Sequence, residues 1–277
     1  MKTSQNPIKK YKILFIIALF VRRYFLKLIN RKSVKLSVEE KSILITLKKD
    51  GIVVIPNYFT LNECGLMKDE FDKYVENHSI YCIENENRIF GIERLSSKVA
   101  KIFSNDQTSF KVCEAYLGEE MTLQATMAAK IEFKEEIEYG SGGSWHRDSF
   151  SRQIKSIAYL TDMDDDNGPF MYIKGSHKFR NIIKVLLKLK RKKNNANNAR
   201  YTKQDMKKAL DILDEKIEYF PCSAGTLILA DIRGLHTTRY LKGGFAYSIF
   251  NYYIAKTDDS KSSGIRKIAD ECVSIKN

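Results

Sequence analysis

The chain has 277 residues, a formal net charge of +13 and 43% hydrophobic residues, which suits one sizeable buried core with an appendage. Its five cysteines lie far apart in the sequence, which excludes a disulfide framework or a zinc site and indicates reduced thiols in a cytoplasmic compartment. The cations are not interleaved with aromatic residues that could stack on bases, so we expect no nucleic-acid partner.

The N-terminal segment, residues 1–33, is both basic and apolar. Lysines precede the apolar run 13–21, and Arg22 and Arg23 close it. The run is too short for a membrane-spanning helix, which needs about 20 apolar residues, and the two arginines stand where a signal peptide has small residues. We therefore predict a helix that docks peripherally, through residues 8–30, on the anionic inner face of a membrane. Packing of this helix on the folded domain is the alternative.

Two capping boxes predict the first helices of the folded domain. The first helix should end near Gly51, and residues 86–118 read as mostly helical. From Met121 onward the pattern changes to that of strands. The two boxes are formed by Ser37 with Glu40 and by Thr60 with Glu63.

A histidine and an aspartate two residues apart give the strongest chemical signal in the chain. His146 and Asp148 flank Arg147, and on an extended segment residues i and i+2 point to the same side. His236 follows the apolar stretch 225–231, which reads as a buried strand with a histidine at its end. Two imidazoles and one carboxylate on one face are the ligands of a non-haem Fe(II) centre, whose opposite face stays open for a co-substrate and dioxygen.

Several segments around this pattern match one known family in order and spacing. They are Asp50–Pro56 with a helix from Thr60, Trp145–Asp148, Ile157–Asp162, Asn167–Ile173 and Gly175–Lys178. Over roughly residues 37 to 255, the chain resembles the phytanoyl-CoA dioxygenase family of Fe(II)/2-oxoglutarate oxygenases. The resemblance implies a mainly β fold with flanking helices, a double-stranded β-helix of the jelly-roll, cupin-like kind. It also implies that His146, Asp148 and His236 hold Fe(II) and act in catalysis, with 2-oxoglutarate as co-substrate.

The residue that would hold 2-oxoglutarate departs from the family pattern. Relatives usually place an arginine about ten residues beyond the distal histidine, because the buried far carboxylate needs a cation that offers a two-pronged hydrogen bond. Residues 243–248 contain no cation. We expect Arg239 or Lys242 to have taken over this role, with Lys130, on the strand before the His-x-Asp loop, as a third candidate. Loose binding of the co-substrate and loss of its use are the alternatives.

A second basic segment, the insertion at about 179–216, interrupts the predicted barrel. Its cations include the run Lys190–Lys193, which precedes an asparagine-rich loop, and a helix is predicted from about 202 to 216. The insertion follows the Gly-Ser-His turn, which in relatives lies near the active-site mouth, so its cations could draw in an anionic substrate. A solvated basic loop is the alternative.

The sequence thus predicts two parts, the segment 1–33 and a jelly-roll oxygenase domain at 34–277. We expect the domain to hydroxylate a small or carrier-linked organic substrate, with dioxygen as oxidant and 2-oxoglutarate decarboxylated to succinate. A catalytically reduced relative that serves as a binding module at the membrane surface is the alternative. Of the other histidines, His177 is expected to form a structural hydrogen bond and His78 to have no partner.

Overall fold

The computed structural model of the protein describes residues 14, 17–18, 20–22, 24–26, 28–30, 32–83, 86–135, 143–189, 200–259 and 264–275. The strands are β1 (Ile52–Ile55), β2 (Tyr81–Ile83), β3 (Glu86–Phe90), β4 (Met121–Glu132), β5 (Gln153–Tyr159), β6 (Phe170–Tyr172), β7 (Glu218–Phe220), β8 (Leu227–Asp231), β9 (His236–Thr238) and β10 (Phe245–Ala255). The helices are α2 (Val38–Asp50), α3 (Leu61–His78), α4 (Ile92–Leu95), α5 (Ser97–Val99), α6 (Gln107–Leu117), α7 (Phe179–Lys188), α8 (Lys203–Leu213) and α9 (Gly264–Ser274), with a π-helical turn at Ala100–Ser104 and a 3-10 turn at Lys256–Asp258.

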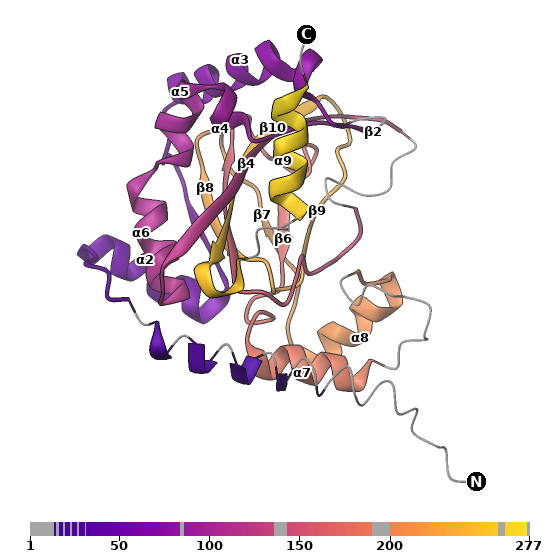
Figure 1. Ribbon diagram of the computed structural model, residues 1–277. Coiled ribbons are helices and arrows are strands. Elements are labelled where there is room, and N and C mark those ends of the chain that lie inside the picture. The colour runs from indigo at the N-terminus through magenta and orange to yellow at the C-terminus, as the bar shows by residue number, and fades with distance from the viewer. Residues whose placement is uncertain are drawn as a thin grey trace.

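Two antiparallel sheets form the two halves of a double-stranded β-helix (Figure 1). The larger sheet has the strand order β1-β8-β5-β10-β4-β3-β2, and the smaller has the order β7-β6-β9. His146 extends the smaller sheet, because its backbone pairs with His236 of β9. The mainly β jelly-roll fold expected from the sequence is therefore confirmed.

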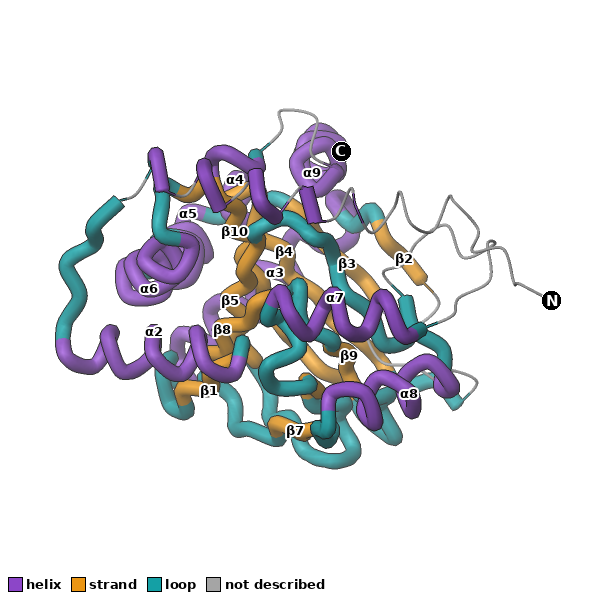
Figure 2. Tube along the Cα trace, turned by 90° about the horizontal axis from the view of Figure 1, so that it is seen from below, coloured by secondary structure: helices purple, strands orange, loops and turns teal. Residues whose placement is uncertain are grey.

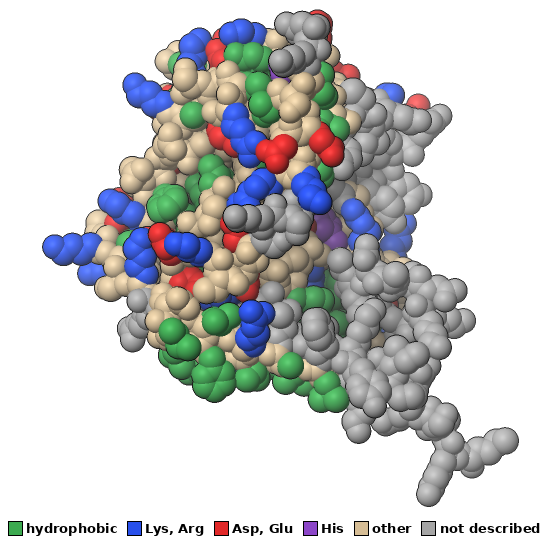
Figure 3. Space-filling model, in the orientation of Figure 1, with side chains coloured by type: hydrophobic (Ala, Val, Ile, Leu, Met, Phe, Trp, Pro, Cys, Tyr) green, Lys and Arg blue, Asp and Glu red, His purple; other side chains and the backbone are tan. Residues whose placement is uncertain are grey.

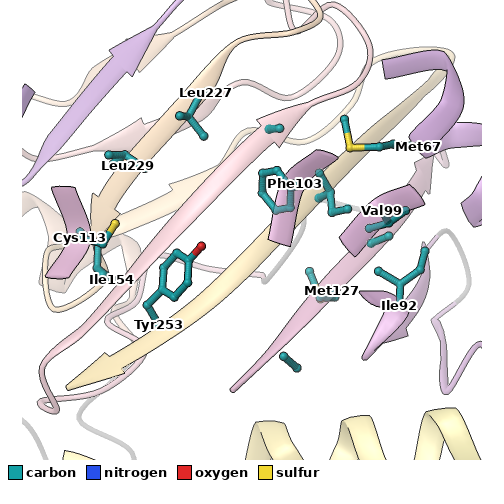
Figure 4. Packing of buried hydrophobic residues seen from close by; sticks show 14 of the residues in the cluster. Met67, Ile92, Val99, Phe103, Cys113, Met127, Ile154, Leu227, Leu229 and Tyr253 are labelled. Atoms are coloured by element: carbon teal, nitrogen blue, oxygen red, sulfur yellow. The ribbon is translucent and has the colours of Figure 1, made fainter. Parts of the chain in front are cut away.

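The two faces of the larger sheet are buried against different partners. Its outer face packs against α2, α3 and α6 through a large apolar cluster, part of which Figure 4 shows. Its inner face meets the smaller sheet through a second cluster, to which Ile157 and Ile228 contribute from one sheet and Phe170 and Tyr172 from the other. Full burial of such a side chain contributes roughly 1.5–3 kcal/mol, so the contact between the sheets fixes the barrel that carries the site.

The predicted capping boxes form as expected. The Ser37 hydroxyl accepts from the backbone N–H of Glu40, and the Glu40 carboxylate accepts from the backbone N–H of Ser37 at 2.7 Å. The second box starts α3 in the same way. Gly51 follows α2 with φ +83°, and a Cβ at this position would lie 2.3 Å from Nδ1 of His177. Only glycine fits there, so the predicted end of the helix is confirmed.

Residues 86–118 are mostly helical, as predicted, but their first part is not. Glu86–Phe90 forms β3, which pairs with β4 along its length. Glu86 and Asn87 have low strand propensity, so the local sequence does not reveal this strand. The free edge of β4 decides the conformation, and the prediction of helix is wrong for these residues.

The described parts of the basic insertion form α7 and α8, which lie side by side (Figure 2). They share a small apolar cluster with Ile173 and Leu235, which anchors the insertion next to β9. The Thr202 cap starts α8 as predicted, but the helix ends early because Asp214 takes a left-handed φ of +54°. The run Lys190–Lys193 and the asparagine-rich loop lie outside the described residues.

The described residues between Leu14 and Ile29 are helical, as predicted for the N-terminal segment. The lysines that precede this helix lie outside the described residues. Within the part of the chain that the structure describes, no helix is both long enough and apolar enough to cross a membrane.

Candidate metal centre

The three predicted iron ligands converge on one point. Nε2 of His146 lies 3.2 Å and Nε2 of His236 lies 3.4 Å from Oδ1 of Asp148. One ligand atom from each residue lies within 4.8 Å of the other two. The backbone N–H of Asp148 donates to the carbonyl oxygen of Ile232 at 3.1 Å. His236 was expected at the end of the strand that became β8. In the structure, β8 ends at Asp231, and His236 is the first residue of β9, after the turn 232–235.

Both histidines present Nε2 to the centre because Nδ1 is engaged elsewhere. Nδ1 of His146 lies 2.8 Å from the carbonyl oxygen of Ser144, and Nδ1 of His236 lies 2.9 Å from that of Gly234. A carbonyl oxygen only accepts, so Nδ1 carries the proton and Nε2 keeps its lone pair. Nε2 of His236 is buried and has no hydrogen-bond partner among the described residues. A metal ion would satisfy this atom.

The surroundings keep the carboxylate charged and one imidazole neutral. Burial acts to raise the pKa of Asp148, but the charge of Lys155 and the two neighbouring imidazoles outweigh it and hold this pKa well below its usual range. Burial lowers the pKa of His236, and the neighbouring His146 lowers it further. A charged carboxylate and a neutral imidazole are the forms that bind metal ions. The residues present therefore fit Fe(II).

Arg147 points away from the centre and fixes the segment that carries two of its ligands. The residue is 1% exposed. Its guanidinium donates to the Tyr201 hydroxyl at 3.1 Å, to the carbonyl oxygen of Ser176 at 2.9 Å and to that of Arg233. These partners lie in the segment before α8, the Gly-Ser-His turn and the turn between β8 and β9. Arg147 thus ties three distant segments to the His-x-Asp segment.

A buried ion pair holds the turn that positions His236. Asp231 is fully buried, and its carboxylate accepts from Nε of Arg233 at 3.0 Å and from the Tyr116 hydroxyl at 2.6 Å. The Tyr172 hydroxyl donates to the carbonyl oxygen of Asp231 at 2.8 Å. The Tyr172 ring in turn stacks on the ring of His236, with centroids 6.5 Å apart. The position of the third ligand therefore depends on this network.

Replacing Asp231 by asparagine should strongly destabilise the fold, because it leaves Arg233 buried without a charged partner. Breaking one half of a buried ion pair costs about 3–5 kcal/mol, which chemical denaturation of the metal-free protein would measure. Asp165→Asn is the matched control, since the Asp165 side chain is 75% exposed in its pair with Arg239 and such surface pairs contribute little. Equal stability of the two variants would contradict the role given to the buried pair.

Lys155 is a residue of the centre that the sequence analysis missed. Its Nζ lies 2.6 Å from Oδ2 of Asp148 and 4.6 Å from the centroid of the Tyr252 ring, and its side chain is 12% exposed. Lys155 stands opposite Tyr252 in the sheet and shares a face of β5 with Ile157, which packs against the smaller sheet. The sequence did offer one signal for this role, because a lysine on the buried face of a strand is rare unless it is paired.

The three cations proposed from the sequence form ion pairs with other carboxylates. The pairs are Arg239 with Asp165 at 2.9 Å, Lys242 with Asp166 at 2.8 Å and Lys130 with Glu132 at 2.7 Å. Ala246, in the segment 243–248 where the family resemblance led us to expect an arginine, is 1% exposed and belongs to the cluster between the sheets, together with Ile131 and Leu241. Ala246 is thus surrounded by apolar side chains. The role of the three cations in binding 2-oxoglutarate stays a prediction.

The two remaining histidines lie outside the cluster of ligands. His177 is buried with Nε2 3.3 Å from the carbonyl oxygen of Lys48, so the structural role expected for it is confirmed. His78 does have partners, contrary to the prediction. Its Nδ1 lies 3.0 Å from the carbonyl oxygen of Cys272, and its ring packs edge-on against Tyr74. The partner on α9 is distant in sequence and could not be inferred locally.

Comparison with known proteins agrees with this architecture. A model of the phytanoyl-CoA dioxygenase family (PhyH) matches residues 47–242. The chain belongs to this family. The match lies within the stretch 37–255 over which the resemblance was expected, and it includes all three predicted ligands.

The ectoine dioxygenase of Stutzerimonas stutzeri (strain A1501) is 24% identical to this family member over 155 residues. These residues cover 47% of the chain and 48% of the enzyme. The chain thus matches about half the length of this curated relative.

Solved structures share the fold at low sequence identity. SnoN, an epimerase in complex with Fe3+, alpha ketoglutarate and nogalamycin RO, has a TM-score of 0.62 at 13% identity over 82% of this chain and 91% of SnoN. EctD from S. alaskensis with bound Fe has a TM-score of 0.58 at 18% identity, over 82% of this chain and 79% of EctD. HygX from Streptomyces hygroscopicus, with nickel, 2-oxoglutarate and hygromycin B bound, has a TM-score of 0.56 at 16% identity, over 80% of this chain and 88% of HygX.

Proposed function

We propose that this member of the phytanoyl-CoA dioxygenase family is a non-haem Fe(II)- and 2-oxoglutarate-dependent dioxygenase that hydroxylates a small or carrier-linked organic substrate. The convergence of His146, Asp148 and His236 carries the proposal, together with the buried Nε2 of His236, which has no hydrogen-bond partner in the part of the chain that the structure describes. Family membership supports it. The iron and alpha ketoglutarate bound by SnoN and the 2-oxoglutarate bound by EctD support it as well.

The chain holds its ligands in place before any ion binds. When bound, Fe(II) and 2-oxoglutarate would supply the oxidising chemistry, with 2-oxoglutarate decarboxylated to succinate. Hydrogen bonds at Nδ1 orient both imidazoles, and the backbone of Asp148 is tied to Ile232. The rings of Phe170 and Tyr172 lie 5.6 and 6.5 Å from the ring of His236. These apolar contacts exclude water from that side of the centre and keep the ligands rigid.

Lys155 is the cation that we assign to the far carboxylate of 2-oxoglutarate. In the structure it neutralises Asp148 at 2.6 Å. Once Asp148 binds a divalent ion, the ammonium group stands beside a centre with net positive charge, and a dianion restores neutrality in a site of low dielectric constant. The long lysine stem lets Nζ turn from Asp148 to a nearby carboxylate. Arg88, whose charge also reaches Lys155, is already paired with Glu86 at 2.5 Å.

The relatives support a small-molecule substrate without naming it. The relative from Stutzerimonas stutzeri is named an ectoine dioxygenase. HygX has hygromycin B bound, and SnoN is in complex with nogalamycin RO. Because fold alone does not fix what enters a barrel, the proposal is restricted to this class.

Release of succinate tests the proposed function. Purified protein mixed with Fe(II), 2-oxoglutarate and oxygen should form succinate slowly without substrate and faster with it, and Asp148→Ala should form none, because the ion loses its only anionic ligand from the chain. Wild-type protein that binds iron but forms no succinate under any of these conditions would favour the alternative, a binding module that retains only the metal centre.

A further inference from the structure

The helix of the N-terminal segment exposes apolar side chains that the proposed function does not use. Large hydrophobic side chains on it are 48–79% exposed. Figure 3 shows hydrophobic side chains gathered along the lower edge of the molecule, where Figure 1 places this helix. The exposed residues are Leu14, Val21, Tyr24, Phe25, Leu28 and Ile29. An apolar surface of this extent on a helix indicates that something covers it.

The exposed side of α7 continues this surface. The ring of Phe179, at the start of α7, lies 4.6 Å from the ring of Phe20 on the N-terminal helix. Phe179 is 41% and Leu187 60% exposed, while Ile182 is buried and Val185 turns inward to the cluster shared with α8. Exposed cations lie four residues apart along the same helix, at Arg180, Lys184 and Lys188, so they form a row next to the apolar side chains. We call the exposed side chains of the N-terminal helix and α7 the basal surface.

The N-terminal helix rests on the barrel without the close packing of a core helix. A cavity of about 540 Å³ has Phe20 and Tyr24 in its wall on the helix side and Lys48 and Arg233 among its residues on the side of the barrel. A second cavity, of about 350 Å³, is lined in part by Ile29. Both hollows are partly open to solvent, whereas a helix packed in a protein interior leaves few gaps larger than a water molecule. The helix is therefore held at the surface, and packing on the domain does not account for its exposed apolar side chains, such as Phe25 and Leu28.

The charge of both helices identifies the partner. The chain has no acidic residue before Glu39 and none between Asn167 and Gln204, so the segments that carry the basal surface are purely cationic. A second copy of the chain would bring the same positive charge and be repelled. A nucleic acid would not require a row of exposed aliphatic side chains. We propose that the basal surface docks on an anionic phospholipid membrane, with its apolar side chains in the boundary between headgroups and acyl chains.

Vesicle sedimentation tests this proposal and needs neither iron nor a substrate. The full chain should sediment with vesicles that contain phosphatidylglycerol, bind far less to pure phosphatidylcholine, and be largely released by about 0.5 M salt, which screens exposed charges. Phe25→Ser and Leu187→Ser, one on each helix, should each lower the partition coefficient about tenfold, because each removes apolar area from the interface. Replacing Arg180 and Lys184 by glutamine should lower it about fivefold per charge.

Leu61→Ser is the matched control, because Leu61 is 74% exposed at the start of α3, far from the basal surface. This variant should bind as wild type does, and all variants should melt like wild type because none of the altered side chains is buried. Absence of binding to anionic vesicles would overturn the proposal, as would unchanged binding of Leu187→Ser or equal loss in Leu61→Ser. A wild-type dimer that Phe25→Ser dissociates would show that a second copy covers the surface instead.

Discussion

His146→Ala and His236→Ala should each abolish stoichiometric binding of Fe(II) while leaving the domain folded. Each variant removes one of three side chains from the chain's ligand set, and the loss should exceed the about 10–100-fold that removal of an outer-shell hydrogen bond costs. A local carbonyl oxygen holds Nδ1 of each histidine and so fixes the direction of its Nε2. In each variant the remaining imidazole therefore stays in its own position and does not replace the lost ligand. Iron per chain, measured after removal of free metal, should fall from about one to near zero.

His78→Ala serves as the control for the loss of a histidine. His78 contacts Cys272 and Tyr74 and lies outside the ligand cluster, and its replacement should leave iron binding unchanged. Far-ultraviolet circular dichroism would confirm that the two site variants keep their fold. Undiminished iron binding in both His146→Ala and His236→Ala would refute the assignment of the centre, whatever reaction the protein catalyses.

Lys155→Met should weaken 2-oxoglutarate binding about tenfold or more, since hydrogen bonds to charged groups contribute about 1.5–3 kcal/mol. Methionine keeps most of the side-chain volume beside the Tyr252 ring while it removes the charge. Binding should be measured by calorimetric titration of the Fe(II)-loaded protein without oxygen, which does not depend on turnover. Iron affinity should stay equal or rise, because Nζ of Lys155 competes with the ion for Asp148 in the metal-free chain.

Arg239→Met and Lys242→Met decide between this assignment and the one made from the sequence. Both side chains are paired with aspartates of the turn before β6, so their removal should leave 2-oxoglutarate binding close to that of wild type. If Arg239→Met or Lys242→Met weakened 2-oxoglutarate binding while Lys155→Met did not, the residue replaced in that variant would be the one that binds the far carboxylate. Weaker iron binding in Lys155→Met, with normal 2-oxoglutarate affinity once loaded, would show that the lysine only positions Asp148.

Much of the fold and the metal centre follows from the sequence, because the signals involved are local. A capping box at Ser37 depends on residues three positions apart, and the shared direction of His146 and Asp148 depends on the alternation of an extended chain. The apolar stretch 225–231 pointed to the third ligand, His236, the family resemblance implied the same three ligands, and the family model confirms the family itself.

Only the tertiary structure decided which side chains complete the centre. β3 is a strand because β4 offers it an edge, although its first residues, Glu86 and Asn87, have low strand propensity. Arg239 was a candidate for binding 2-oxoglutarate. In the structure it pairs with Asp165, which is 74 positions away in the sequence. Lys155 is part of the site because β5 turns its face toward the smaller sheet and Asp148. The partner of such a charged group depends on the tertiary structure. Burial makes each charge pairing strong, and only the packing of the sheets determines which groups are buried together.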